Sequence, residues 1–309
     1  MFETLEAGFM TTIQDGGRIG YQKLGITTSG ALDEFSRRCA NALVGNSREA
    51  AVLEITASGP TLRALSNCLI AVTGAELAPR VNGNTLPTNM ALYVRPGSLV
   101  EFAAREWGAR AYLAVAGGFE TPPVLGSRAT DLRAGIGGIE GRALQAGDSL
   151  TIGTPRGDIF SRAGLTLAER ARIFLRDDSP LSVVVGPHRD FFSDAALQVF
   201  FGSEYRVDEA SDRMAVRLRG EKIERRMGEI LSCGVAPGAI QVPIDGQPIV
   251  LMADRQTTGG YPIFGCVIRA DIPRLAQKMP GEAMRFEEVS LDVARAKYLK
   301  MEQVLEQAI

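Results

Sequence analysis

Short apolar runs, each closed by glycine, proline or asparagine, recur along this chain and constrain its fold more than any other feature. Clear examples are residues 69–73, 91–95, 111–116 and 181–185. Runs of this length, bounded by turn residues, are typical of β-strands rather than helices. Turn signals such as Val81-Asn82-Gly83-Asn84 follow at close spacing. The pattern predicts a mainly β protein with a few helices, in the manner of sandwiches and barrels.

Helical spacing of apolar residues occurs in a few places only. Residues 32–44 carry it first, with Ser29 or Asp33 as a candidate N-cap and Gly45 at the end. A second, short helix is predicted at 195–201. A third is predicted at 290–308, as a C-terminal helix docked on a barrel.

A length of 309 residues is long for one hydrophobic core, so two domains of similar size are expected. The polar and charged stretch 154–179 separates two strand-rich halves. We therefore predict an N-terminal β-rich domain at 1–165 and a C-terminal β-barrel domain with its helix at 166–309.

Charge and composition exclude several classes of function. Lys and Arg number 34 against 36 Asp and Glu, which leaves no field to hold nucleic acid or an anionic membrane. Neither a membrane span nor a secretory signal is recognisable, so a cytoplasmic protein is expected. The four cysteines are widely spaced, and with His188 as the single histidine they predict reduced, buried thiols rather than a metal site.

The strongest chemical signal lies in residues 238–262. An apolar strand at 249–253 runs directly into Asp254 and Gln256, and two threonines and a Gly-Gly-Tyr-Pro turn follow. Strands that end in polar clusters on glycine turns commonly deliver side chains to a site. Glutamine amides and threonine hydroxyls both donate and accept hydrogen bonds, which suits a neutral amide ligand. We interpret this segment as functional.

Two earlier segments leave the structural and functional interpretations open. In residues 11–22, paired glycines let backbone N–H groups approach a ligand, and Asp15 and Arg18 flank them. These two side chains hold either one another or a polar substrate. Asn41 and Glu54 form either a buried network supporting the first helix or a ligand-facing amide and carboxylate.

Two further features carry less information. The dipeptide Asp212-Arg213 is expected to be a surface or turn pair. His188 follows a strand in a Gly-Pro-His turn, and any Ser–His–Asp or Cys–His arrangement would depend on it alone. Acid–base work would fall more naturally to an Asp or Glu with a perturbed pKa.

These motifs, in this order, resemble the allophanate hydrolase subunit 2 family, whose members include the C subunit of 5-oxoprolinase, the KipA regulators and the carboxyltransferase region of urea carboxylases. The resemblance covers nearly the whole chain. It is carried by TTIQDGGRIGYQ, SGALD, ANALVGN, LEIT, YLAVAGG, GSRATD, GIGGIEGR, SDRM, QTTGGYP and AQKMPG. Ile263 and Ala215 depart from residues common in relatives.

The resemblance implies two cyclophilin-like β-barrel domains and a role in a complex of several subunits. The expected partners are a KipI-like (allophanate hydrolase subunit 1) protein and a LamB/YcsF-type subunit. Together they would open 5-oxo-L-proline to L-glutamate with ATP, which would bind through the complex. No nucleotide-binding motif and no AMKM-type biotin site occurs in this sequence, so biotin within this chain is not expected.

The resemblance and the residues together give one set of site candidates. Asp254 is the candidate for acid–base or orienting work. The candidates for substrate binding are Gln241, Gln256, Thr258, Tyr261, Asp15, Arg18 and Asn41. Two alternatives stay open, namely a carboxyltransferase for urea- or allophanate-type amides with biotin supplied in trans, and a non-enzymatic KipA-like binder of a kinase inhibitor.

Overall fold

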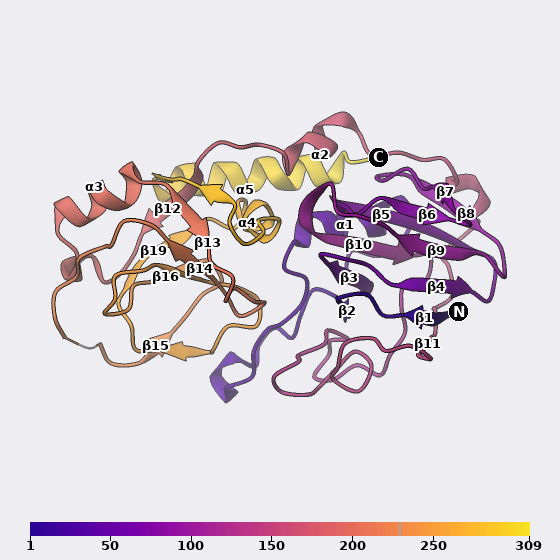
Figure 1. The fold of residues 1–309 in the computed structure, drawn as a ribbon, viewed down its shortest axis with the longest axis horizontal. Coiled ribbons are helices and arrows are strands. Elements are labelled where there is room, and N and C mark those ends of the chain that lie inside the picture. Colours follow the sequence, from indigo (N-terminus) through magenta and orange to yellow (C-terminus); the bar gives the residue numbers. More distant parts are fainter. Residues whose placement is uncertain (229) are drawn as a thin grey trace. The chain divides into compact units, whose positions relative to one another are not determined.

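The computed structural model describes residues 1–228 and 230–309, and the chain forms two compact units. Unit 1 comprises Met1–Arg18, Ser29–Arg176 and Val304–Ile309, and unit 2 comprises Ile19–Thr28 and Asp177–Gln303. In Figure 1 the strands of unit 1 run from indigo to magenta, and those of unit 2 lie in the pink to yellow range. The fold is mainly β with barrel-like sheet, as the pattern of short apolar runs predicts.

Unit 1 is built from two antiparallel sheets. The first has the order β11-β1-β4-β9-β6-β7 and the second β2-β3-β10-β5-β8. Their inward residues alternate along the strands and form one core. The strands are β1 (Phe2–Glu6), β2 (Met10–Gln14), β3 (Val52–Thr56), β4 (Thr61–Ala64), β5 (Cys68–Glu76), β6 (Pro79–Val81), β7 (Asn84–Thr85), β8 (Ala91–Val94), β9 (Leu99–Phe102), β10 (Trp107–Val115) and β11 (Ser149–Leu150).

Helix α1 (Glu34–Leu43) packs on β5 and β10 and confirms the first predicted helix. Its N-cap is Asp33, whose carboxylate accepts from the Ser36 N–H at 2.8 Å. The chain leaves the helix at Gly45, where φ is +77°, a conformation that costs glycine little. Phe35 and Leu43 bury the apolar face of the helix.

Within its described residues, unit 2 contains an eight-stranded sheet of order β20-β13-β14-β17-β16-β19-β12-β21 and the short pair β15-β18. Strands β12 and β21 pair in parallel, and the other pairs are antiparallel. The strands are β12 (Leu181–Val185), β13 (Tyr205–Val207), β14 (Ala215–Arg219), β15 (Cys233–Gly234), β16 (Ala239–Gln241), β17 (Ile249–Leu251), β18 (Thr258–Gly259), β19 (Ile263–Val267), β20 (Ala283–Met284) and β21 (Phe286–Glu288).

The other helices agree with the sequence in two cases and add two more. Helix α3 (Asp194–Gly202) and helix α5 (Leu291–Glu306) confirm the predictions at 195–201 and 290–308. Helices α2 (Glu169–Phe174) and α4 (Ile272–Ala276) were not predicted, because each is too short to show a full apolar period. Short 3₁₀ turns occupy Gln22–Leu24, Phe160–Arg162 and Arg189–Phe191.

The two units differ from the predicted domains 1–165 and 166–309 in where the chain divides. Unit 1 extends through Arg176 because α2 belongs to its core, where Ala171 is buried and Phe174 stacks on Phe35 at 4.3 Å. Residues Ile19–Thr28 belong to unit 2 and the last residues of α5 to unit 1. Which unit a segment belongs to depends on contacts between residues distant in sequence. A single boundary along the chain cannot describe units that are each made of several separate segments.

Candidate functional site

The glutamine candidates of unit 2 lie together. Gln241 is the last residue of β16 and is 2% exposed, and Gln256 follows β17 and is half-buried. The Gln256 Nε2 donates to the Gln241 Oε1 at 3.3 Å. Among the described residues, neither the Gln241 Nε2 nor the Gln256 Oε1 has a hydrogen-bond partner, although both atoms are buried. One donor and one acceptor of this hydrogen-bonded pair of amides are therefore left unsatisfied.

Gly259 lies directly against the Gln241 amide. A Cβ added to Gly259 would come 2.3 Å from the Gln241 Nε2 and 3.3 Å from Val235 Cγ1. Space, not backbone conformation, thus explains glycine at this position of the QTTGGYP motif. Gly259 belongs to β18, which pairs with β15 through Cys233↔Gly259 and Gly234↔Thr258.

The segment around the amides is held by side chains that donate to its backbone. The Gln22 Nε2 donates to the carbonyls of Val235 at 3.1 Å and Thr257 at 3.0 Å. The buried Arg255 also donates to the Val235 carbonyl, at 3.1 Å from its Nε. Burial lowers the pKa of the Arg255 guanidinium from its ordinary value. Gln22 and Arg255 are not among the predicted site residues, although Gln22 ends the TTIQDGGRIGYQ motif and Arg255 directly precedes QTTGGYP.

Asp254 forms a buried ion pair. Its Oδ2 lies 2.8 Å from the Arg213 Nε and its Oδ1 lies 3.1 Å from the Arg213 Nη2, and both side chains are 6% exposed. Arg213 is therefore not the surface or turn residue that the sequence suggested. The neighbouring Asp212 does act in a turn, since it accepts from the Met214 and Ala215 N–H groups. The bidentate geometry favours an orienting role for Asp254 over proton transfer.

The two remaining candidates of unit 2 face outward. Thr258 is exposed within β18, and Tyr261 is 49% exposed in the turn that precedes β19. They lie on the same short segment as Gln256, and in the described structure neither side chain is hydrogen-bonded to Gln241 or Gln256.

In unit 1 the candidates Asp15 and Arg18 are engaged by the protein itself. The Asp15 carboxylate accepts from the Gly17 N–H at 2.8 Å and from the Ser127 hydroxyl and the Arg128 N–H at 2.6 Å each. Arg18 is 1% exposed and donates to the Ala129 carbonyl. The two side chains thus anchor the segment at 127–129 to the glycine turn.

Asn41 is likewise part of a satisfied network. Its Nδ2 donates to the Ala50 carbonyl at 2.8 Å, and its Oδ1 accepts from the Asn46 Nδ2 at 2.9 Å. Asn46 also bonds the Val115 carbonyl and the Gly117 N–H. These contacts favour the structural interpretation of Asn41, and they tie the end of α1 to the end of β10.

Glu54 and Tyr112 form a second network beneath α1. The Glu54 Oε2 accepts from the Tyr112 hydroxyl and the Leu32 N–H, each at 2.8 Å. The Tyr112 oxygen in turn accepts from the Asp33 N–H at 2.8 Å. Burial, followed by the nearby Glu54, raises the pKa of Tyr112 well above its ordinary value. The carboxylate on this apolar strand therefore supports the start of α1.

The surroundings of His188 and of the four cysteines do not favour catalysis or metal binding by these residues. The His188 Nδ1 accepts from the Ile263 N–H at 3.1 Å, so only its Nε2 is available to a ligand. Cys39 and Cys68 are buried, whereas Cys233 and Cys266 are partly exposed, contrary to the expectation of four buried thiols. Burial raises the pKa of both Cys68 and Cys266 to about 11. Over residues 1–228 and 230–309, no group of three His, Cys, Asp or Glu is placed to hold a metal.

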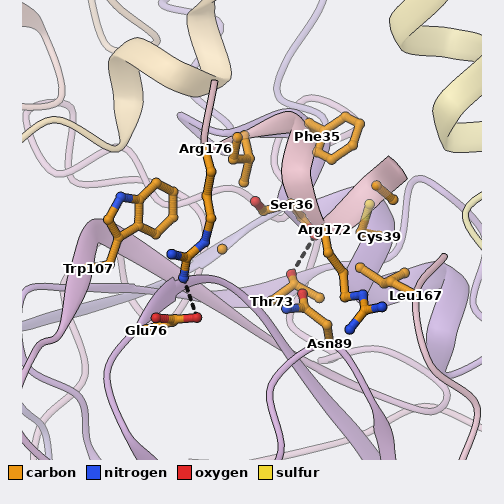
Figure 2. Close-up of a pocket in the computed structure, with 13 residues that line it drawn as sticks. Phe35, Ser36, Cys39, Thr73, Glu76, Asn89, Trp107, Leu167, Arg172 and Arg176 are labelled. Atoms are coloured by element: carbon orange, nitrogen blue, oxygen red, sulfur yellow. Dashed lines mark hydrogen bonds and ion pairs between the residues drawn. The ribbon is translucent and has the colours of Figure 1, made fainter. Parts of the chain in front are cut away.

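A small hollow in unit 1 is lined by none of the predicted site residues (Figure 2). It is bounded by α1, β5 and α2. Arg176 forms an ion pair with Glu76 and lies over the Trp107 ring, 4.9 Å from its centroid. The Thr73 hydroxyl donates to the Ser36 carbonyl at 2.7 Å. Since these groups satisfy one another, the glutamine pair of unit 2 is the better candidate site.

The fold and these side chains define a class of protein. It is mainly β, it has two units, and in unit 2 the amide of Gln241, at the end of β16, is hydrogen-bonded to the amide of Gln256. Residues 24–288 match the family described as carboxyltransferase domain, subdomain A and B. The chain belongs to this family. No helix in the described part of the chain is long and apolar enough to cross a membrane.

Similar proteins fall into two groups. The chain is 41% identical to the C subunit of 5-oxoprolinase from Escherichia coli, over 95% of this chain and 93% of that protein. It is 37% identical to the C subunit of 5-oxoprolinase from Haemophilus influenzae, over 99% and 97%. The crystal structure of K. lactis urea amidolyase superposes with a TM-score of 0.90 at 28% identity, over 99% of this chain but only 20% of that one.

Proposed function

We propose that this chain is one subunit of an ATP-dependent 5-oxoprolinase, which opens the lactam of 5-oxo-L-proline to give L-glutamate. One observation carries the proposal: the 41% identity to the C subunit of the E. coli 5-oxoprolinase extends over nearly the full length of both chains. The unsatisfied amides of Gln241 and Gln256 support it, because they suit a neutral amide ligand.

The proposed assembly divides the work between its members. The partners are a KipI-like protein and a LamB/YcsF-type protein, and ATP would bind through them or the complex, because the chain contains neither a Walker A motif nor Gly-x-Gly-x-x-Gly. This chain would bind and orient the lactam through its glutamine amides. Asp254, held by Arg213, would maintain the strand end on which Gln256 lies.

The test is release of glutamate from 5-oxo-L-proline, measured with the chain alone, with both partners, and with both partners but without ATP. We expect turnover only in the complete mixture with ATP. Absence of glutamate from an assembled, folded complex would contradict the proposal.

A second candidate is a carboxyltransferase for urea-type amides with biotin supplied by another protein. The family description and the likeness to urea amidolyase favour it. No AMKM sequence is present to carry biotin. Transfer of a carboxyl group from a biotinylated partner protein to urea, without glutamate release in the first assay, would establish this alternative.

A further inference from the structure

We propose that Gln241 and Gln256 form a two-point recognition site for a cis amide, and that the pair β15–β18 covers this site through Gly259. The Gln241 Nε2 would donate to the carbonyl of the ligand, and the Gln256 Oε1 would accept from its N–H. Naming 5-oxoproline as the natural ligand rests on the proposed function, whereas the cis-amide chemistry rests on the two side chains.

The first step is the state of the two amides. One hydrogen bond, from the Gln256 Nε2 to the Gln241 Oε1, joins them head to tail. Each remaining atom is attached to the same carbon as a bonded one, so the free donor and the free acceptor belong to one hydrogen-bonded pair of amides. Buried polar atoms normally have partners, and leaving one without a partner is destabilising. A donor and an acceptor left together on one linked pair therefore point to a ligand that supplies both counterparts.

The second step concerns the shape of that ligand. In an ordinary trans amide the N–H and C=O point in opposite directions, so one compact site cannot engage both. In a small lactam the ring holds the amide cis, and both groups lie on one edge. The cis form is rare for open secondary amides. A donor beside an acceptor thus selects a lactam, and it rejects the corresponding lactone, which has no N–H.

The third step is access. Both free atoms are shielded from solvent, and Gly259 lies over the Gln241 amide, where a Cβ would come within 2.3 Å. The strand that contains Gly259 is two residues long and pairs only with β15 among the described residues. A ladder this short separates readily, so parting β18 from β15 would expose the amides and closing it would exclude water from the bound lactam.

Gln247 supplies a matched comparison within the same unit. Its Oε1 accepts from the Gly220 N–H at 3.0 Å and its Nε2 donates to the Gly220 carbonyl at 3.1 Å. Both ends of this amide are therefore engaged by the protein. Replacing Gln247 should reduce stability and leave ligand binding unchanged, whereas replacing Gln241 should weaken ligand binding.

The experiment is titration calorimetry on the full chain with 5-oxo-L-proline and with the lactone of the same ring. We expect the wild-type protein to bind the lactam roughly tenfold more tightly than the lactone. Gln241→Leu should weaken binding of both compounds by roughly tenfold, while Gln256→Leu should abolish only the preference for the lactam. Gln247→Leu is the control, and thermal unfolding shows that each variant is folded.

The outcomes separate this inference from the proposed function. Equal lactam binding by wild type and a folded Gln241→Leu variant would overturn the inference, as would failure of the wild type to bind the lactam alone and in the assembled complex. Turnover by the complex that Gln241→Leu leaves unchanged would uphold the function and overturn the inference. Lactam binding that depends on Gln241, in a complex that releases no glutamate, would uphold the inference and overturn the proposed function.

Discussion

Asn41 in unit 1 and Gln241 in unit 2 are both buried amides near the end of a regular element, and they differ in one respect. Asn41 bonds the Ala50 carbonyl and the Asn46 side chain, so both of its polar atoms are engaged. Gln241 uses only its Oε1, and its Nε2 has no partner in the described structure. The comparison teaches that burial alone does not distinguish a structural amide from one available to a ligand, whereas its hydrogen-bond partners do.

The same criterion divides the other candidates. Asp15 accepts hydrogen bonds from three groups of its own unit, and Asp254 is paired with Arg213. Both carboxylates therefore hold the architecture together. Four substitutions, with expected effects that decrease from Asp254 to Gly259, test this division between side chains that hold the structure and side chains available to a ligand.

Asp254→Ala should have the largest effect, a loss of about 3–5 kcal/mol in unfolding free energy, because it leaves the buried Arg213 without its carboxylate. Denaturant unfolding measures this loss. The double change Arg213→Met with Asp254→Leu should restore most of the stability, since neither charge of this buried pair remains. If that folded double variant supports normal glutamate release in the complex, Asp254 is not a catalytic residue.

Asn41→Leu should lower the unfolding free energy by about 2–3 kcal/mol, because the Ala50 carbonyl loses its side-chain donor and the Asn46 amide loses one of its two acceptors. Gln241→Leu, measured in parallel by the same denaturant titration, should cost less, since it removes one long hydrogen bond, that from the Gln256 Nε2 at 3.3 Å, and a donor that has no partner. Equal losses for the two variants would contradict the division.

Tyr112→Phe should cost about 1–3 kcal/mol at neutral pH, since the Asp33 N–H and Glu54 lose the hydroxyl between them. The pKa of Tyr112 is raised by burial and by Glu54, so the folded protein keeps its proton where the unfolded chain loses it. Stability should therefore fall as pH rises above about 10, the ordinary tyrosine value.

Urea unfolding between pH 8 and 11 tests this pH dependence. The fall should be shallower in Tyr112→Phe without vanishing, because burial also raises the pKa of Tyr205 to about 12 and that of Cys68 and Cys266 to about 11. An unchanged slope in the Tyr112→Phe variant would mean that Tyr112 does not contribute to the pH dependence.

Gly259→Ala should have the smallest effect, about 1–2 kcal/mol, because the added Cβ meets the Gln241 Nε2. Adding Gln241→Ala should relieve the contact, so the two changes together should cost less than the sum of their separate effects. Thermal unfolding of the single and double variants measures the coupling. Strict additivity would show that Gly259 and Gln241 do not touch.

Much of the fold was predictable from local pattern. Residues 69–73, 91–95, 111–116 and 181–185 became β5, β8, β10 and β12, because short apolar runs between turn residues suit a strand. The helices α1, α3 and α5 followed from apolar spacing and caps. The site was predictable only as a segment: Gln241 and Gln256 lie together, but the partner of Asp254 stands 41 positions away at Arg213.

By itself, the sequence determined the mainly β class, the elements with a clear period and, through its motifs, the family. These depend on neighbouring residues, whose spacing is visible in a linear chain. Only the tertiary structure decided which polar groups are satisfied, that Ile19–Thr28 belongs to unit 2, and that Gly259 lies over the Gln241 amide. The physical reason is that hydrogen-bond partners and close contacts are set by residues distant in sequence, which only the folded chain brings together.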